Sequence, residues 1–283
     1  MKLEAVAKAV CKSKGLTFVK PVGAGAFKET FHVQGAAGNE LALKIYQPGF
    51  SPQRTQREIK AMMRCAHSNI AKLADLFNFD WAGHSYLVSL EEFLPGGTLA
   101  EHIKKSGLLN SQAAQDIGEQ LIDAVSHIAA LGLVHRDLKP ENIAFREDGT
   151  TPVVLDFGLV RDLADSSLTA TWMPHGPGTP IFSPPEQILN EKHLIDWRSD
   201  QFSLGVLISI CTFGFHPFAE PSLPDVEVVD RVAQRQPQAS RFRAAANTAR
   251  LPTLIRMTGV WPVERVRTPQ ELARCWSAQK RGS

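Results

Sequence analysis

The residues with the clearest chemical potential lie between positions 135 and 156. Residues 135–142 read HRDLKPEN, and Asp156 begins the triplet Asp-Phe-Gly. Phosphoryl transfer from a magnesium nucleotide requires an acid that orients the attacking hydroxyl, oxygen ligands for the metal and a cation beside the transferred phosphate. Asp137 is therefore the candidate catalytic acid/base and Lys139 the candidate cation. Asn142 and Asp156 are the candidate magnesium ligands.

This run and its spacing to Asp156 resemble the eukaryotic-type (Hanks-type) protein kinases, and their Ser/Thr branch in particular. The resemblance extends from about Thr17 to Trp276, so we expect no regulatory domain within this sequence. It implies an α+β, bilobal fold, with a small antiparallel-sheet N-lobe that carries one main helix and a larger, mostly helical C-lobe. The implied ranges are 1–91 for the N-lobe, 92–97 for the hinge, 98–283 for the C-lobe and 156–186 for the activation segment within it.

Composition and charge fit an ordinary globular protein. The 283 residues are 43% hydrophobic and 21% charged, and a formal net charge of +2 gives no reason to expect nucleic acid as a partner. Residues 1–14 alternate charged and apolar side chains, which predicts a short amphipathic helix rather than a signal peptide. Residues 204–215 are apolar but too short to span a membrane, so they predict a buried helix.

The four cysteines point to a reducing compartment. They stand far apart and form no Cys-x-x-Cys pair, which argues against a disulfide framework or a zinc site. We expect packed, unreactive thiols and a cytoplasmic protein, with no membrane association.

A glycine-containing hairpin near the N-terminus is the first candidate nucleotide contact. Strands are predicted over 17–22 and 30–34, and glycines between them allow backbone N–H groups to point at phosphates. The resemblance assigns this contact to Gly23, Ala24, Gly25, Ala26 and Phe27. The loop departs from the family pattern, since Lys28 stands where a third glycine is usual and Thr30 where a valine covers the adenine. Lys28 could add a phosphate contact or point to solvent, and we expect it to point to solvent.

Lys44 is the second candidate nucleotide contact. Residues 41–46 alternate as a strand does, and the resemblance implies that Lys44 holds the α- and β-phosphates. The alternative is an edge-strand lysine that faces water. Glu58 lies fourteen residues later, on a helix predicted over 53–65, and is the expected partner of Lys44.

The segment 91–99 resembles the hinge that binds adenine. The backbones of Glu92 and Leu94 are the implied contacts with the adenine edge. Glu91 then falls at the back of the nucleotide pocket, a position that is normally apolar. Either the alignment slips by one and Leu90 takes this position, or a buried carboxylate has a partner, because a lone buried carboxylate is costly.

In the C-lobe, a helix is predicted over 111–131, with Ser111 as its N-cap and Gly132 as its stop. Short strands over 143–145 and 153–155 are expected to deliver Asp156 to the metal. Asp200 resembles the residue that braces the catalytic loop. It is also a possible helix N-cap, and the two roles are compatible.

The end of the activation segment carries Ser/Thr-type features. The resemblance implies that Thr179 bonds the catalytic acid and lysine, and that Glu186 pairs with Arg265. Kinases with an arginine before the catalytic acid, here Arg136, often require a phosphate on this segment. Candidate acceptors, in order, are Thr171 and Thr169, followed by Ser166 and Ser167. The alternative is that no phosphosite exists and that Trp172 and nearby prolines hold the segment.

An arginine-rich stretch offers a weaker signal. Residues 231–263 contain six arginines and no acidic residue. They could form a docking face, Arg231 to Arg256, for an acidic partner or target sequence. The alternative is a solvated loop and helix surface.

The function predicted from these motifs is transfer of the γ-phosphate of Mg-ATP to Ser/Thr hydroxyls of proteins, with ATP and Mg²⁺ as cofactors. One alternative is a pseudokinase or scaffold that binds nucleotide without turnover, although Lys44, Asp137 and Asp156 are all present. Another is a kinase of a small molecule, whose relatives usually lack the 139–142 and 178–186 motifs. The motifs alone leave transfer of a nucleotide open.

Overall fold

The computed structural model describes residues 3–25, 28–48, 63–156, 161–162 and 180–281. The chain divides into two compact units. Unit 1 comprises Met1–Ala66 and Ala71–Pro95, and unit 2 comprises His67–Ile70 and Gly96–Ser283. An antiparallel sheet dominates unit 1 and helices dominate unit 2, which confirms the predicted α+β kinase fold class.

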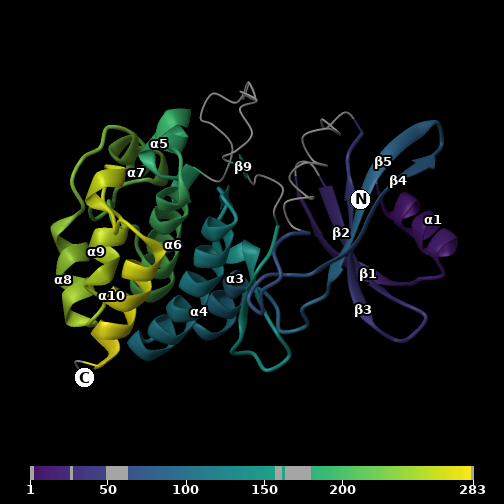
Figure 1. The fold of residues 1–283 in the computed structure, drawn as a ribbon, viewed down its shortest axis with the longest axis horizontal. Coiled ribbons are helices and arrows are strands. Elements are labelled where there is room, and N and C mark those ends of the chain that lie inside the picture. The colour runs from purple at the N-terminus through teal and green to yellow at the C-terminus, as the bar shows by residue number, and fades with distance from the viewer. Residues whose placement is uncertain (1–2, 26–27, 49–62, 157–160, 163–179, 282–283) are drawn as a thin grey trace. The chain divides into compact units, whose positions relative to one another are not determined.

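The sheet of unit 1 has five strands in the order β1-β2-β3-β5-β4, and every neighbouring pair is antiparallel (Figure 1). The predicted strands are present, and most extend one or two residues further than expected. Their bounds are β1 (Thr17–Ala24), β2 (Lys28–Gln34), β3 (Glu40–Tyr46), β4 (Leu73–Trp81) and β5 (His84–Glu92). β3 lies at the centre of the sheet, so side chains on both of its faces can be enclosed.

One face of this sheet is covered by α1 (Glu4–Lys14), the amphipathic helix that the sequence predicted. Helically spaced apolar residues of α1 join alternate residues of the strands in one core, which includes Val6, Val10, Leu43, Val88 and Leu90. Because side chains alternate along a strand, the residues between them, such as Lys44 and Ser89, lie on the other face. The polar candidate residues of unit 1 are therefore segregated from its α1-covered core.

Unit 2 is built from helices with a few short strands (Figure 1). The helices are α3 (Leu99–Ser106), α4 (Ser111–Ala130), α5 (Pro185–Ile188), α6 (Trp197–Phe213), α7 (Asp225–Ala233), α8 (Ser240–Thr248), α9 (Thr253–Met257) and α10 (Pro269–Arg281). The strands are β6 (Leu133–Val134), β7 (Ile143–Phe145), β8 (Pro152–Val154) and β9 (Arg161–Asp162), and the 3₁₀ turns are η1 (Pro140–Asn142), η2 (Pro180–Phe182), η3 (Lys192–Leu194) and η4 (Pro262–Glu264).

The segment His67–Ile70 belongs to unit 2 for a clear physical reason. Asn69 Nδ2 donates to the Pro152 carbonyl at 2.7 Å, and Ile70 forms a parallel bridge with Val154. These contacts attach the segment to β8, the strand that leads to Asp156.

The two long helices of unit 2 begin at caps that differ from those predicted. The N-cap of α4 is Asn110, whose side chain accepts the Ala113 N–H at 2.9 Å, so Ser111 is the first helical residue and not the cap. Asn and Ser are comparable caps, and the extended backbone of Asn110 decides between them. The N-cap of α6 is Asp196, which leaves Asp200 inside the first turn and without a capping role.

A glycine allows α10 to approach α4 closely. A Cβ atom at Gly118 would lie 2.2 Å from Trp276 Cζ2, so no side chain fits there. The Trp276 indole N–H donates to the Gln115 carbonyl at 3.0 Å. This contact fixes α4, which leads through β6 into the catalytic loop.

Two further properties concern the molecule as a whole. Across the described residues, no helix combines the length and apolarity needed to cross a bilayer. Cys11, Cys65 and Cys211 are buried and Cys275 is half-buried. Burial raises the pKa of Cys65 to about 11 and that of Cys211 to about 12, so these thiols stay protonated at neutral pH. This agrees with the expectation of packed, unreactive cysteines.

Candidate active site

The catalytic loop of unit 2 is held by a buried carboxylate. Asp200 accepts the backbone N–H of His135 at 2.7 Å on one oxygen and that of Arg136 at 2.9 Å on the other. Burial raises the pKa of Asp200, and the two N–H donors together with His135 and Arg136 act in the opposite direction. Arg136 has φ of +70°, a left-handed conformation that a non-glycine residue adopts at a cost. The bracing role predicted for Asp200 is therefore present.

Three predicted residues meet at the end of this loop. Asp137 Oδ2 accepts a hydrogen bond from Asn142 Nδ2 at 2.9 Å and lies 3.0 Å from Lys139 Nζ. Asn142 Nδ2 also donates to the Asp137 carbonyl at 2.8 Å. The side chain of Asp137 is 11% exposed, so it is oriented by its neighbours and still partly open. The arrangement places a carboxylate, an ammonium group and an amide within one hydrogen-bond shell.

Asp156 is positioned by the hairpin of β7 and β8. The Leu155 N–H donates to the Asn142 carbonyl at 2.8 Å, which ties the residue before Asp156 to η1. His135 Nε2 donates to the Leu155 carbonyl at 2.9 Å, while its Nδ1 accepts the Asp137 N–H at 3.3 Å. Asp156 itself has φ of +60°. His135 thus links the loop to the segment that carries Asp156, a role that the sequence analysis did not assign to it.

In unit 1, Lys44 is buried against a carboxylate. Lys44 Nζ lies 2.5 Å from Glu91 Oε2, and the Ser89 hydroxyl donates to Glu91 Oε1 at 3.0 Å. Lys44 and Glu91 are 6% and 3% exposed, respectively. The alternative of an edge-strand lysine facing water is therefore wrong. Of the two possibilities for the back position, the structure supports a carboxylate with a partner, because Leu90 faces the α1 core.

The glycine-containing hairpin joins β1 to β2. Gly23 pairs with Thr30, and the Gly25 N–H donates to the Lys28 carbonyl at 2.8 Å. Lys28 stands opposite Tyr46 in the β2–β3 register, and its Nζ lies 5.7 Å from the centre of that ring. The Lys28 side chain is half-buried and lies near this ring, and the expectation that it points to solvent stays a prediction.

The end of β5 leads into residues 92–97, the segment predicted to be the hinge. The Glu92 N–H donates to the Lys72 carbonyl at 2.8 Å, so any adenine contact of Glu92 must use its carbonyl oxygen. Leu94 is buried. The ring of Phe93 stacks on His32 of β2, with centroids 3.8 Å apart. This stack fixes the backbone on either side of Phe93.

Two residues brace the end of the activation segment. Glu186 forms the predicted ion pair with Arg265, at 2.6 and 2.9 Å for its two oxygens. Gln187 was not predicted. Its Nε2 donates to the Arg136 carbonyl at 2.8 Å, which ties α5 to the catalytic loop. Its place directly after Glu186 was the signal that could have identified it.

Several predicted residues cannot be placed. Those outside the described residues are Ala26, Phe27, Glu58, Ser166, Ser167, Thr169, Thr171 and Thr179. Their roles stay predictions. Within the described ranges, no group of three or more His, Cys, Asp or Glu side chains could hold a metal ion.

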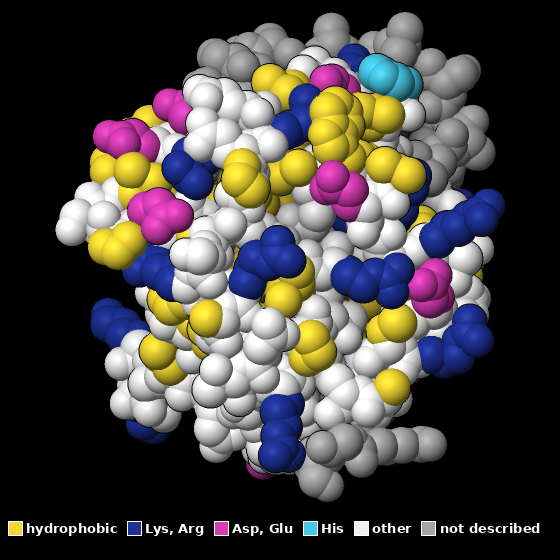
Figure 2. Space-filling view, turned by 90° about the vertical axis from the view of Figure 1, so that its left-hand side faces the viewer, with side chains coloured by type: hydrophobic (Ala, Val, Ile, Leu, Met, Phe, Trp, Pro, Cys, Tyr) yellow, Lys and Arg dark blue, Asp and Glu magenta, His cyan; other side chains and the backbone are white. Residues whose placement is uncertain are grey.

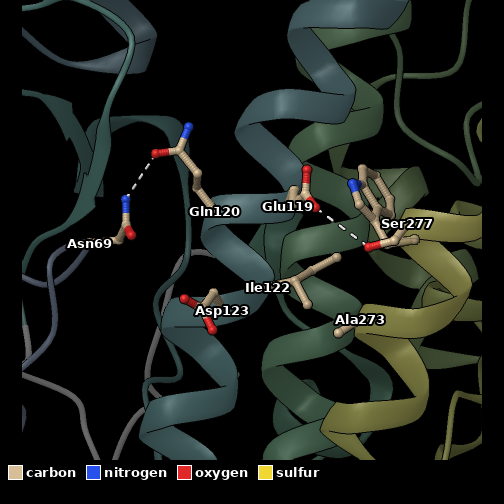
Figure 3. Close-up of a pocket in the computed structure, with 8 residues that line it drawn as sticks. Asn69, Glu119, Gln120, Ile122, Asp123, Ala273 and Ser277 are labelled. Carbon is tan, nitrogen blue, oxygen red and sulfur yellow. Dashed lines mark hydrogen bonds between the residues drawn. The ribbon is translucent and has the colours of Figure 1, made fainter. Parts of the chain in front are cut away.

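A pocket on unit 2 is separate from the catalytic loop (Figure 3). It lies along α4 and α10, where Asn69 contacts Gln120 at 3.2 Å and Ser277 contacts Glu119 at 3.5 Å. None of the predicted site residues lines it. The candidate catalytic residues of unit 2 therefore lie at the catalytic loop and not at this pocket.

Comparison with known proteins identifies the family. The family model described as "Protein kinase domain" matches residues 16–254. The chain belongs to the protein kinase family. The kinase motifs recognised in the sequence thus lie within the matched region, apart from Arg265.

Curated kinases from plants, bacteria and fungi show the same relationship. "CBL-interacting protein kinase 11" of Oryza sativa subsp. japonica is 30% identical over 80% of this chain and 44% of its own length. "Serine/threonine-protein kinases drp72" of Corynebacterium efficiens is 30% identical over 86% of the chain and 46% of its own length. "Serine/threonine-protein kinase ppk25" of Schizosaccharomyces pombe is 33% identical over 72% of this chain and 48% of its own length. The chain spans less than half the length of these relatives.

Proposed function

We propose that this kinase transfers the γ-phosphate of ATP to serine and threonine hydroxyls of proteins. The observation that carries the proposal is the cluster at the catalytic loop. Asp137 is held by Asn142 at 2.9 Å and by Lys139 at 3.0 Å, and its side chain remains partly exposed. A carboxylate fixed in this way can accept the proton of an incoming hydroxyl while the adjacent ammonium stabilises the transferred phosphoryl group.

The donor set fits magnesium. Asn142 uses its amide nitrogen to hold Asp137, so the other end of its side chain, the amide oxygen, is the atom suited to a metal. The Asp156 carboxylate supplies further oxygen, and Mg²⁺ prefers oxygen ligands. When bound, the ion would neutralise phosphate charge. The protein residues contribute orientation and electrostatic stabilisation, which provide most of the rate acceleration in phosphoryl transfer.

Lys44 is the proposed phosphate clamp, and the backbones of Gly23 to Phe27 the proposed phosphate cover. Lys44 Nζ is enclosed, so its charge is weakly screened by solvent. Glu92 and Leu94 are the proposed adenine contacts. Since Lys44, Asp137, Asn142 and Asp156 are all present, the residue set favours catalysis over nucleotide binding alone.

A transfer assay tests this function. Wild type is incubated with γ-labelled ATP, magnesium and a generic basic protein, beside Asp137→Asn, Lys44→Met and the matched surface control Asp123→Asn. We expect label on serine or threonine in wild type and in the control, and a loss of about a hundredfold or more in the other two variants. Nucleotide binding without any transfer by wild type would instead identify a pseudokinase, and transfer only to small molecules would reject protein as the substrate.

Activation-segment phosphorylation is a further proposal. Thr171, and then Thr169, are the proposed acceptors, because a phosphate there could pair with Arg136. We expect a Thr169→Ala/Thr171→Ala variant to lose activity. Phosphatase treatment of wild type should cause the same loss. Full activity in the double variant would reject these sites.

The arginine-rich stretch supports an acidic partner less strongly than its composition suggested. Arg235 pairs with Glu191 and Arg256 with Glu271, while Arg241 donates to the Ala219 carbonyl at 2.6 Å. Figure 2 shows basic side chains spread over this face of unit 2 among neutral, apolar and acidic ones.

We propose that any docking of an acidic segment uses Arg243 and Arg250, which are both exposed. Unchanged substrate affinity in an Arg243→Glu/Arg250→Glu variant would reject it. We also propose a cytoplasmic location, because the four thiols form no disulfide and the buried ones stay protonated.

A further inference from the structure

The contact between Lys44 and Glu91 is the feature of unit 1 that the proposed function does not explain. The two groups lie 2.5 Å apart, and their side chains are 8% and 4% exposed. Both carboxylate oxygens are used, one by Lys44 and the other by the Ser89 hydroxyl. Two hydrogen bonds thus join the three residues inside unit 1.

The strand register brings these residues together. In the antiparallel β3–β5 pair, Lys44 stands opposite Ser89 and Ala42 stands opposite Glu91. Residues two apart on a strand share a face, so Ser89 and Glu91 project from β5 beside Lys44. Ala42 leaves room for the Glu91 side chain to reach diagonally across the pair. The anchoring carboxylate therefore comes from the sheet itself.

A buried ion pair needs an explanation beyond stability. Removing two charges from water is costly. Well-packed apolar residues at the same two positions often stabilise a protein as much as a buried ion pair does, or more. An ammonium group has three donors, of which Glu91 takes one. Within the described part of the chain, the pair thus orients a lysine and leaves it with donor capacity.

We propose that Glu91 is a positioning residue that anchors Lys44 from β5 and presents its remaining N–H groups to the phosphates of the nucleotide. This inference rests on the proposed function, because it assumes that Lys44 binds phosphate. It departs from the expectation that Glu58 is the partner that orients Lys44. Because the Glu91 carboxylate is buried and held by Lys44 and Ser89, we assign its action to the lysine and not to the nucleobase.

A double-mutant cycle on nucleotide affinity tests the proposal. ADP and adenosine are titrated against wild type, Glu91→Met, Lys44→Met and the double variant. We expect Glu91→Met to weaken ADP binding about tenfold, the typical value of one charge-assisted interaction, while adenosine affinity changes less than about twofold. In the Lys44→Met background the same substitution should have little further effect, because there is no ammonium left to position.

Controls separate a positioning role from a structural one. Asp75→Asn removes the partner of Lys14 in a second lysine–carboxylate pair of unit 1, an exposed one at 3.0 Å, and should leave both affinities unchanged. Glu91→Gln keeps the shape of the side chain and replaces Glu91→Met if that variant fails to fold. In steady-state kinetics we expect KM for ATP to rise in the Glu91 variants without a matching loss of adenosine binding.

Two results would overturn the inference. One is equal weakening of ADP and adenosine, which indicates a structural role. The other is ADP affinity that stays unchanged in Glu91→Met but falls in Glu58→Gln. If wild type transfers phosphate in the labelled-ATP assay, either result rejects only the role of Glu91 and leaves the proposed function standing. If wild type neither binds ADP nor transfers phosphate, the proposed function fails with it.

Discussion

Each unit of this kinase contains a buried ion pair, and the two pairs differ in how completely their hydrogen bonds are satisfied. In unit 2, Arg265 contacts both oxygens of Glu186 and also donates to the carbonyls of Gly259 and Arg198. The Ser199 hydroxyl completes the carboxylate shell at 2.8 Å. Neither ionic side chain is exposed to solvent. Four of the five guanidinium N–H groups are thus used within the protein.

Among the described residues, the ion pair of unit 1 uses a smaller share of its hydrogen-bond donors. Glu91 occupies one donor of Lys44, and the partner is a flexible ammonium in place of a planar guanidinium. A pair whose donors are mostly used within the protein and which is closed to solvent is suited to holding the fold. An unsaturated pair orients a charge that can act on something else. The comparison favours an architectural role for Glu186–Arg265 and is consistent with the proposed role of Lys44–Glu91 in nucleotide binding.

The largest expected effect comes from breaking the saturated pair. Arg265→Met leaves Glu186 charged and buried without its partner, and should lower the free energy of unfolding by about 3–5 kcal/mol. Urea denaturation of full-length protein measures this. Arg256→Gln breaks an exposed pair with Glu271 and should cost about 1 kcal/mol or less. Equal losses for the two variants would contradict the architectural role.

Replacing both members of each pair sharpens the contrast. Glu186→Met/Arg265→Met removes the partners of the buried Ser199 hydroxyl and of the Gly259 carbonyl, so it should cost about 3 kcal/mol. Lys44→Met/Glu91→Met leaves only Ser89 without its partner and should cost about 1 kcal/mol, yet abolish phosphate transfer. Unfolding curves and the labelled-ATP assay measure the two properties in parallel. A larger loss of stability in Lys44→Met/Glu91→Met than in Glu186→Met/Arg265→Met would contradict the comparison.

A buried histidine gives unit 2 a pH dependence. Burial lowers the pKa of His216 to about 4, from an ordinary value near 6.5. The unfolded chain then binds a proton that the folded state refuses, so stability falls as the pH drops from 6.5 towards 4. Between pH 7 and pH 5 the loss should be about 2 kcal/mol. The difference between the urea midpoints at pH 7 and pH 5 should be clearly smaller in His216→Asn than in wild type. The same difference in both proteins would contradict this assignment.

The smallest effect is expected at the exposed pair of unit 1. Lys14 and Asp75 lie 3.0 Å apart, but their side chains are 39% and 44% exposed. Asp75→Asn should change the free energy of unfolding by about 0.5 kcal/mol or less, and the change should vanish at high salt. A loss comparable to that of Arg265→Met would show that burial does not govern these pairs.

The sequence predicted the parts of the fold and site that depend on local patterns. Alternation located the strands, helical spacing located α1 and α4, and the motif around Asp137 located the catalytic loop. It did not predict the partner of Lys44, because Glu91 lies 47 residues away and reaches Lys44 only through the β3–β5 register. It also missed the N-cap of α4, where Asn110 and Ser111 are adjacent residues of similar capping ability.

The most direct test of the central claim is a crystal structure of the kinase bound to Mg-ADP. We predict that Lys44 Nζ lies within about 3 Å of both Glu91 Oε2 and a phosphate oxygen. A complex in which Glu91 points away from Lys44, while another carboxylate holds the lysine against the phosphates, would contradict it.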